Sequence, residues 1–409
     1  MVNIIKKLIT KVSYTLFYRK FKNFLNDAIK NLYIMKLLKE IWIFLKNTVN
    51  IGHSKEYSKI LYSLLFPREP WNIDNVKFHD KFLEINGWAL APQGNHQLVT
   101  FMINNTDFNQ INYPTLRKDV KTVFWYYPQA EISGFTCRAK ITKEKALANG
   151  PITFKYINKK TKHPIYDYHN FYYFEDDLIL PDATRMKRVQ GNESEFEFRF
   201  IGYSMYATLE LILKKVFNKS FDDFSNILDW GCGCGRITRY FKNLKNASIT
   251  CVDIDSDNIN WCKKYLEFGN FLTIPLHPPT SLKDNFFNLI MGISIFTHLK
   301  EKEQYEWLRE LRRISADGAI LLMSISSTSI ICRSNLAPSI FNSWWKKGIY
   351  IVDYPFLDFE NIIAEPDYYK AVFHTHDYIK KNWSKYFEIV AIIPACIGTL
   401  QDLVIMRKI

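Results

Sequence analysis

The chain of 409 residues lacks several features that would have fixed its class directly. It has no run of eighteen apolar residues, so the sequence predicts no membrane-spanning helix. Its seven cysteines are odd in number, which argues against a disulfide framework and favours a reducing, cytoplasmic compartment. No CxxC pair occurs, and Cys232-x-Cys234 has no accompanying Cys or His pair, so no metal site is predicted.

Acidic residues are outnumbered: 41 aspartates and glutamates stand against 54 lysines and arginines, which gives a net charge of +13. The excess is concentrated in residues 1–50, which hold ten basic residues against Asp27 and Glu40. Apolar residues recur there at helical period, so residues 1–70 are predicted to form a basic amphipathic helical segment. Two interpretations stay open. The segment is either a packing element with a solvated lysine face, or a peripheral contact with anionic lipid at the inner face of the membrane.

The hydrophobic period changes to two after a boundary at Pro67–Pro70. Short alternating runs then predict an antiparallel β-sandwich-like module over residues 71–165. The runs are residues 82–90, 97–104, 134–141 and 151–158. Residues 166–225 are predicted to be a linker with a helix from Gly202 to Phe217. From residue 226 to residue 409 strands and helices alternate, which predicts a mostly parallel sheet with helices on both faces.

A glycine-rich loop follows the first strand of this last domain. Residues 226–239 read NILDWGCGCGRITR, an apolar strand that ends in alternating glycines before a helix expected from about Arg236. Because glycine lacks a Cβ atom, the main chain can turn sharply there and a ligand can lie against it. The next strand, over residues 248–254, contains Asp253 near its end, where a carboxylate can accept both hydroxyls of a ribose. The pattern predicts a nucleoside site.

The loop is not the GxGxxG of dinucleotide-binding folds. Its residues Asp229 to Gly235 resemble motif I of the class I S-adenosylmethionine (SAM)-dependent methyltransferases. The resemblance implies an α/β fold with a Rossmann-like seven-stranded domain over residues 226–409, and it implies SAM as the cofactor. The implied cofactor-binding residues are Asp229, Gly231, Cys232, Gly233, Gly235, Asp253, Ile254 and Ser294. The adenine partner stays unassigned, because prolines follow the third strand where many members carry an acid or amide.

The run FNLIMGISIFTHL, residues 287–299, resembles motif IV and the segment after it. It places Ser294 beside the expected sulfonium. His298 either acts on the acceptor, as a base or as a pocket residue, or has a structural role, in which it caps the next helix or bonds a backbone group. An aromatic insertion over residues 327–373 stands where this fold commonly carries its acceptor lid. The acceptor-side candidates are Tyr354, His374 and His376.

The module over residues 71–165 carries the elements GWA, RKDV and SGF, which resemble a β-rich module of bacterial surface-polysaccharide enzymes. The resemblances together imply a methyltransferase that O-methylates a saccharide or glycolipid intermediate of a surface polysaccharide. Methyl transfer to a protein or small metabolite stays open, as does a non-catalytic scaffold with the same fold. No nucleic-acid partner is predicted, because the NPPY or DPPY motif of amino-methylating enzymes is absent and the basic residues cluster outside the SAM domain.

Overall fold

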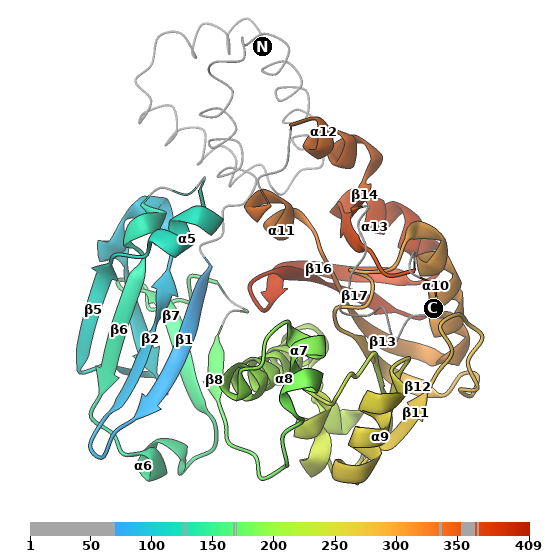
Figure 1. The fold of residues 1–409 in the computed structure, drawn as a ribbon, viewed down its shortest axis with the longest axis horizontal. Helices are drawn as coiled ribbons and strands as arrows, with labels where there is room; N and C mark the ends of the chain where they lie inside the picture. The colour runs from blue at the N-terminus through green and yellow to red at the C-terminus, as the bar shows by residue number, and fades with distance from the viewer. Residues whose placement is uncertain are drawn as a thin grey trace, which may run out of the picture. The chain divides into compact units, whose positions relative to one another are not determined.

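The structure is a computed structural model, and it describes residues 70–409 except residues 126, 128, 167, 169, 335–337, 353–364, 366 and 367. The described residues belong to one compact unit, Arg68–Ile409. The predicted helical segment of residues 1–70, for which a packing role and a lipid contact both stay open, therefore lies outside the described residues, apart from Pro70. Figure 1 labels the helices and strands.

The first part of this unit contains two four-stranded antiparallel sheets, ordered β1-β2-β6-β5 and β4-β3-β7-β8 (Figure 1). The strands are β1 (Trp71–Phe78), β2 (Leu83–Ala89), β3 (Val99–Ile103), β4 (Thr106–Asp107), β5 (Gln110–Thr115), β6 (Gly134–Ala139), β7 (Ile152–Asn158) and β8 (Phe171–Tyr173), with the short helices α5 (Lys118–Val123) and α6 (Lys143–Leu147). Alternate residues of β2 are buried, and the two sheets share one hydrophobic core. Strand β8 lies past residue 165, so the second sheet extends into the predicted linker.

The sequence elements that suggested this module have structural roles in it. The Arg117 guanidinium forms ion pairs with Asp74 and Asp119, each at 2.6 Å. A Cβ atom on Gly87 would lie 2.0 Å from the carbonyl oxygen of Asn72 on the paired strand β1, so only glycine fits there. These residues hold neighbouring segments of the module together.

The second part is built on a seven-stranded sheet, ordered β11-β10-β9-β12-β13-β17-β16. Its strands are β9 (Asn226–Trp230), β10 (Ser248–Asp253), β11 (Asn270–Thr273), β12 (Phe287–Gly292), β13 (Ser315–Ile325), β16 (Glu388–Ile397) and β17 (Gln401–Arg407). The first five are parallel, while β17 is antiparallel to both of its neighbours. The predicted α/β domain with a mostly parallel sheet is confirmed. Because β17 is reversed, its first residues lie at the same edge as the carboxyl ends of β12 and β13.

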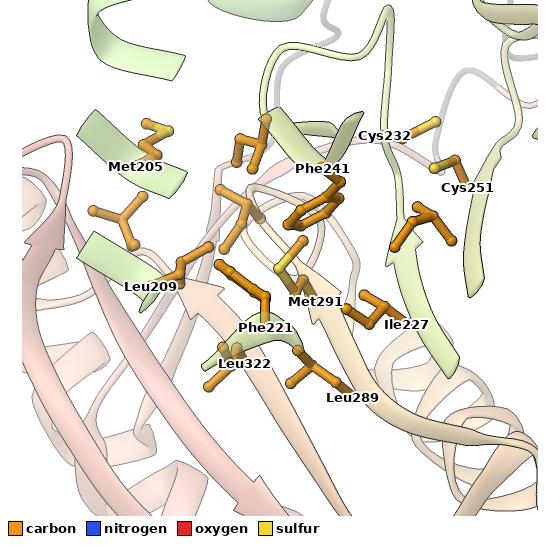
Figure 2. Close-up of a cluster of buried hydrophobic side chains, with 14 of the residues drawn as sticks. Met205, Leu209, Phe221, Ile227, Cys232, Phe241, Cys251, Leu289, Met291 and Leu322 are labelled. Atoms are coloured by element: carbon orange, nitrogen blue, oxygen red, sulfur yellow. The ribbon is translucent and has the colours of Figure 1, made fainter. Parts of the chain in front are cut away.

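Both faces of this sheet are buried, as apolar strands of a parallel sheet require. One face packs against α8 (Glu195–Phe217), and Figure 2 shows Leu209 of that helix among Ile227, Leu289 and Leu322 of the strands. The other face carries Leu228 and packs against a second apolar cluster. The helices of the domain are α7 (Ala183–Gln190), α8, α9 (Ser256–Tyr265), α10 (Glu301–Ile314), α11 (Thr328–Arg333), α12 (Pro338–Lys347) and α13 (His376–Asn382).

Two predicted helices differ from the structure. The helix expected from about Arg236 is only a 3-10 segment, Thr238–Asn243, because the alternating glycines keep the preceding main chain in positive φ and delay the first helical turn. The helix expected from Gly202 begins earlier, at Glu195, where the hydroxyl of Ser194 caps it by accepting a hydrogen bond from the Glu197 amide. In the aromatic insertion, strands β14 (Ile349–Val352) and β15 (Ala371–His374) pair antiparallel.

Candidate functional site

A cleft opens at the carboxyl ends of β9, β10 and β12. Open α/β sheets bind their ligands at this edge. The residues that line it come from the glycine loop, the segments at the ends of β9, β10, β11 and β12, the helices α7, α9 and α10, and the segment before β15. They are Arg188, Val189, Asp229, Trp230, Gly231, Cys232, Gly233, Arg236, Ile237, Asp253, Ile254, Asp255, Asn258, Ile274, Ile293, Ser294, Ile295, Leu299, Trp307, Tyr368 and Tyr369.

The glycine loop takes a conformation that side chains would prevent. Gly231, Gly233 and Gly235 have φ values of 78°, 54° and 78°. A Cβ atom on Gly231 would lie 2.0 Å from the Cδ1 atom of Ile295. Gly235 does not line the cleft; its missing Cβ instead lets Leu266 pack at 2.4 Å from that position. The loop therefore exposes main chain to the cleft on one side and packs tightly on the other.

Asp253 is held in place by main-chain amides. Its Oδ2 atom accepts a hydrogen bond from the Gly233 amide at 2.8 Å, and its Oδ1 atom accepts one from the Asp255 amide at 2.9 Å. Burial raises the pKa of Asp253 to about 6 although these amides favour the ionised form. Carboxylate oxygens have more than one acceptor site each, so acceptor capacity remains toward the cleft.

Asp229 is buried at the end of β9, with 4% of its surface exposed, and the hydroxyl of Thr238 donates a hydrogen bond to its Oδ2 atom. Burial raises the pKa of Asp229 to about 6, and the charge of Asp253 adds to this shift. Asp229 therefore ties the strand end to the 3-10 segment behind the loop while it lines the cleft. Cys232 and Ile254 also line the cleft.

Helix α7 covers the loop from the predicted linker. Val189 lines the cleft, and its Cγ2 atom lies 2.8 Å from where a Cβ atom of Gly233 would stand. The guanidinium of Arg188 reaches Asp257 at the start of α9, at 2.8 Å, and Arg185 reaches the same carboxylate at 2.5 Å. Two helices that contribute residues to the cleft are thus joined by charge-assisted hydrogen bonds.

Ser294 follows β12 with φ at 63°, an uncommon value for serine. Its amide donates to the Ser324 hydroxyl at 2.7 Å, and its own hydroxyl contacts the Gln401 side chain at 2.9 to 3.1 Å. Ser324 also donates to Gln401, at 2.7 Å. A polar network thus joins the ends of β12 and β13 to the start of β17. This is the place where the sequence predicted the sulfonium of the cofactor.

His298, the predicted catalytic residue, does not line the cleft. Its ring stacks on Tyr369 with centroids 4.1 Å apart, and its Nδ1 atom lies 3.2 Å from the carbonyl oxygen of Lys370. Burial lowers the pKa of His298 to about 4. The residue is neutral at physiological pH, and it holds the segment before β15 against the loop after β12. Tyr369, its stacking partner, is the residue that reaches the cleft.

The acceptor-side candidates lie in three different situations. His374 is fully buried; its Nε2 atom contacts Gln304 at 2.8 Å, and burial lowers the pKa of His374 to about 3. It is a core residue outside the cleft. His376 is partly exposed, and its Nε2 atom lies 2.6 Å from a carboxylate oxygen of the fully buried Asp402. Tyr354 lies outside the described residues.

Sequence reasoning missed several residues of the cleft. Arg236 directly follows the glycine loop in the sequence, and this position could have identified it as a residue of the cleft. Val189, Tyr369 and Ile274 are brought in from other segments, and nothing local to each marks it. Within the described residues, no group of three or more His, Cys, Asp or Glu side chains is placed to hold a metal ion. None of the described helices is long and apolar enough to span a bilayer.

Residues 227–318 match the family model described as "Methyltransferase domain". Among solved structures, the N-methyltransferase NodS of Bradyrhizobium japonicum WM9, in complex with S-adenosyl-L-homocysteine (SAH), is 13% identical with a TM-score of 0.35, covering 56% of this chain and 99% of that one. The magnesium protoporphyrin IX methyltransferase of Synechocystis PCC 6803, with bound SAH, is 14% identical with a TM-score of 0.36, covering 56% and 96%. A SAM-dependent methyltransferase of Methanosarcina mazei is 20% identical with a TM-score of 0.35, covering 48% and 97%.

An arginine–tRNA ligase of Wigglesworthia glossinidia brevipalpis is 34% identical over 113 residues, which are 25% of this chain and 19% of the ligase. The chain thus spans about a fifth of the length of this curated relative. We assign no ligase activity from so partial a match.

The cleft fits a sulfonium nucleoside in three respects. The main chain at Gly231 and Gly233 lines the cleft in a positive-φ conformation. Asp253 has acceptor capacity for ribose hydroxyls. The guanidinium of Arg236 has a buried Nε atom without a hydrogen-bond partner among the described residues, and it faces the same cleft. The buried Nε atom of Arg236 without a partner is costly in an empty protein, which is a usual mark of a ligand site.

Proposed function

We propose that this chain, a class I SAM-dependent methyltransferase by its matched domain and its cleft, transfers the methyl group of SAM to a hydroxyl of a saccharide or glycolipid intermediate of a surface polysaccharide. Its cofactor is SAM. The observation that carries the methyl-transfer proposal is the glycine loop bonded to Asp253 inside the matched residues. The choice of a saccharide or glycolipid as the acceptor rests on the resemblance of the β-rich module. The activity of the whole enzyme is part of the proposal.

SAM supplies a methyl group that its sulfonium already activates, so the protein has mainly to position the acceptor and exclude water. Asp253 would hold the ribose, and the apolar side chains of Ile254 and Ile274 offer a slot for the adenine ring beside it. Helix α7 covers the glycine loop through Val189, and its ion pair to Asp257 keeps that cover in place. Ser294 and its partner Gln401 form the wall on the acceptor side.

We assign the acceptor base to His376. Its partner Asp402 is the second residue of β17, and Gln401, the residue before it, contacts Ser294 of the cleft. The carboxylate accepts a hydrogen bond from Nε2–H and leaves Nδ1 as the acceptor atom, which is the tautomer that a general base needs. Asp402 is itself held by the Ala395 amide at 2.7 Å. Tyr354 stays a predicted acceptor-side residue.

The proposal is tested by transfer of tritiated methyl from SAM to the organism's polysaccharide precursors, with peptides and soluble metabolites as the comparison. Label is expected in the saccharide fraction with the wild-type chain and in no fraction with Asp253→Ala. Label in peptides or metabolites alone would move the assignment to the second class of acceptor. Calorimetry with SAM separates the scaffold alternative, because a non-catalytic scaffold with a degenerate site binds no cofactor.

We also propose that residues 1–50 bring the enzyme to the inner face of the membrane. Their excess of basic residues over acidic ones would attract anionic lipid headgroups. Flotation with liposomes that contain phosphatidylserine should carry the full chain and leave a chain without residues 1–50 in solution. Equal flotation of both chains would show that this segment is only a packing element.

A further inference from the structure

The hairpin formed by β16 and β17 carries two residues of the proposed acceptor side directly after its turn. Gln401 is the first residue of β17, and its side chain contacts Ser294. Asp402 is the second, and its carboxylate lies 2.6 Å from the Nε2 atom of His376. The Ala395 amide of β16 donates to the same carboxylate at 2.7 Å. The position of the hairpin therefore determines where the Asp402 carboxylate lies, and this carboxylate orients the His376 ring.

The main chain of the hairpin adopts a conformation that needs support from other segments. Ala395 has a φ of 50° and Thr399 has a φ of 61°, values that are uncommon for residues with a Cβ atom. Both residues are buried, with 6% and 4% of their surfaces exposed. Such conformations persist where the surrounding structure fixes them. The segments that contact the hairpin are therefore expected to hold its shape.

Arg333 joins the hairpin to the β-rich module of residues 71–165. It is the last residue of α11 (Figure 1), and its Nη2 atom donates to the Thr399 carbonyl oxygen at 2.5 Å. Its Cζ atom lies 4.5 Å from the ring centroid of Phe124, which directly follows α5 of the module. Phe124 is buried and packs against Trp88 of β2, with ring centroids 5.0 Å apart. One guanidinium thus contacts the hairpin and an aromatic pair of the module.

A second contact reaches the other strand of the hairpin. The hydroxyl of Tyr166, the residue that follows the module, donates to the Pro394 carbonyl oxygen of β16. Tyr166 is itself buried, with 7% of its surface exposed. Pro394 directly precedes Ala395, whose amide is the donor to Asp402. The hairpin is thus held by the first part of the unit on both strands, close to the residues that bond the Asp402 carboxylate.

We propose that Arg333 is a positioning residue: through the hairpin it holds Asp402 against His376, so that methyl transfer depends on the docked β-rich module. This assignment rests on the proposed function, because it takes His376 as the acceptor base. Arg333 is not among the described residues that line the cofactor cleft. Its substitution should therefore change kcat and leave the affinity for the cofactor unchanged.

The first test is the rate of methyl transfer from SAM to the organism's polysaccharide precursors. For Arg333→Met, kcat should fall about tenfold, because a small displacement of a catalytic group can cost up to about 10²-fold. The affinity for SAH in calorimetry should stay within about twofold. Arg333→Lys, which keeps a cation next to Phe124, should recover part of the loss. Arg138→Met, the matched control, removes a guanidinium that lies over Phe82 inside the module, and it should leave kcat unchanged.

A double-mutant cycle separates positioning from general destabilisation. If Arg333 acts through Asp402, then Arg333→Met should change kcat by less than about twofold when Asp402→Asn is already present. A loss as large in that background as in the wild type would overturn the assignment, and so would an unchanged kcat in the wild-type background. The thermal midpoint of each variant checks the fold. If Arg333→Met fails to fold, Phe124→Leu, which removes the ring under the guanidinium, replaces it in the cycle.

A measurement without any acceptor keeps this assignment apart from the proposed function. In magnetic resonance spectra of the chain labelled with ¹⁵N-histidine, His376 should show a protected proton on Nε2 in the wild type and in Arg138→Met. The signal, identified by its absence in His376→Gln, should weaken or disappear in Arg333→Met. An unchanged signal there would overturn the assignment of Arg333. A wild-type chain that transfers no methyl group to any acceptor would refute the proposed function, while the spectra still decide whether Arg333 positions His376.

Discussion

The affinity for the nucleoside should fall as the pH drops below about 6. Asp253 would accept hydrogen bonds from the ribose only when it is ionised, and burial raises the pKa of Asp253 to about 6. The sign follows from the direction of the shift. A protonated carboxyl group keeps one oxygen as a donor, so it can no longer accept from both ribose hydroxyls. Binding therefore favours the ionised form and weakens as protons compete with the ligand.

The size of the effect follows from that pKa. A single carboxyl group with a pKa of about 6 is mostly ionised at pH 7, and at pH 5 it is ionised to roughly one part in ten. The affinity should then fall about tenfold between pH 7 and pH 5, which corresponds to about 1.4 kcal/mol. In the unliganded protein, the contribution of Asp253 to the free energy of unfolding changes with pH in the opposite direction. Because the folded-state pKa is raised, the contribution of Asp253 to the free energy of unfolding declines as the pH rises through the window from about 4 to about 6.

Calorimetry with 5′-methylthioadenosine between pH 5 and pH 8 measures this effect, since the ligand has no titrating amino-acid portion. Asp253→Asn should bind weakly, with little change over the same range. The charge of Asp255 also raises the pKa of Asp253, so Asp255→Asn should move the titration of Asp253 to lower pH. An affinity that is constant from pH 5 to pH 8 in the wild type, or an unchanged affinity in Asp253→Asn, would refute the placement of the ribose.

Three further substitutions test other parts of the site. Gly231→Ala forces a side chain into φ of 78° and against Ile295, so it should lower the free energy of unfolding by about 1 to 3 kcal/mol in urea melts and weaken SAH at least about tenfold in calorimetry. His376→Ala should lower kcat for methyl transfer by about 10²-fold or more without changing SAH affinity, whereas an unchanged kcat would end its role as the base. Asp402→Asn keeps the shape but presents a donor to His376, so kcat should fall while KM changes little.

The cofactor half of the site was predictable from sequence because its chemistry is local. Asp229, Gly231 and Gly233 lie in or directly after β9, and Asp253 ends β10, so the register of β9 with β10 brings them together. Positive φ at Gly231 and Gly233 could likewise be expected from the residue type, because glycine adopts positive φ without steric strain. For these residues, knowledge of the strand pattern was enough to predict their meeting in one cleft.

The contacts of the residues on the proposed acceptor side were not predictable, because they join distant segments. Ser294 meets Gln401 across 107 positions of sequence. His298 was a reasonable catalytic candidate as an imidazole after a strand end, but it lies against Tyr369 and the carbonyl of Lys370, 72 positions on, and these contacts bury it. The proposed role of His376 rests on its contact with Asp402, and sequence spacing does not reveal this contact.

Strand β15 of the insertion is hydrogen-bonded to segments at the edge of the sheet, and this bears on how the acceptor would be selected. The Val372 amide donates to the Thr297 carbonyl at 2.8 Å, and the His374 amide donates to the Ser326 carbonyl at 2.8 Å. Strand β15 is therefore bonded to the segments that follow both β12 and β13. A segment held by main-chain bonds at both places keeps its position when side chains change. We therefore expect acceptor specificity to depend on the side chains of this segment. The contacts of His298 with Lys370 and of His374 with Gln304 help to hold the segment in place.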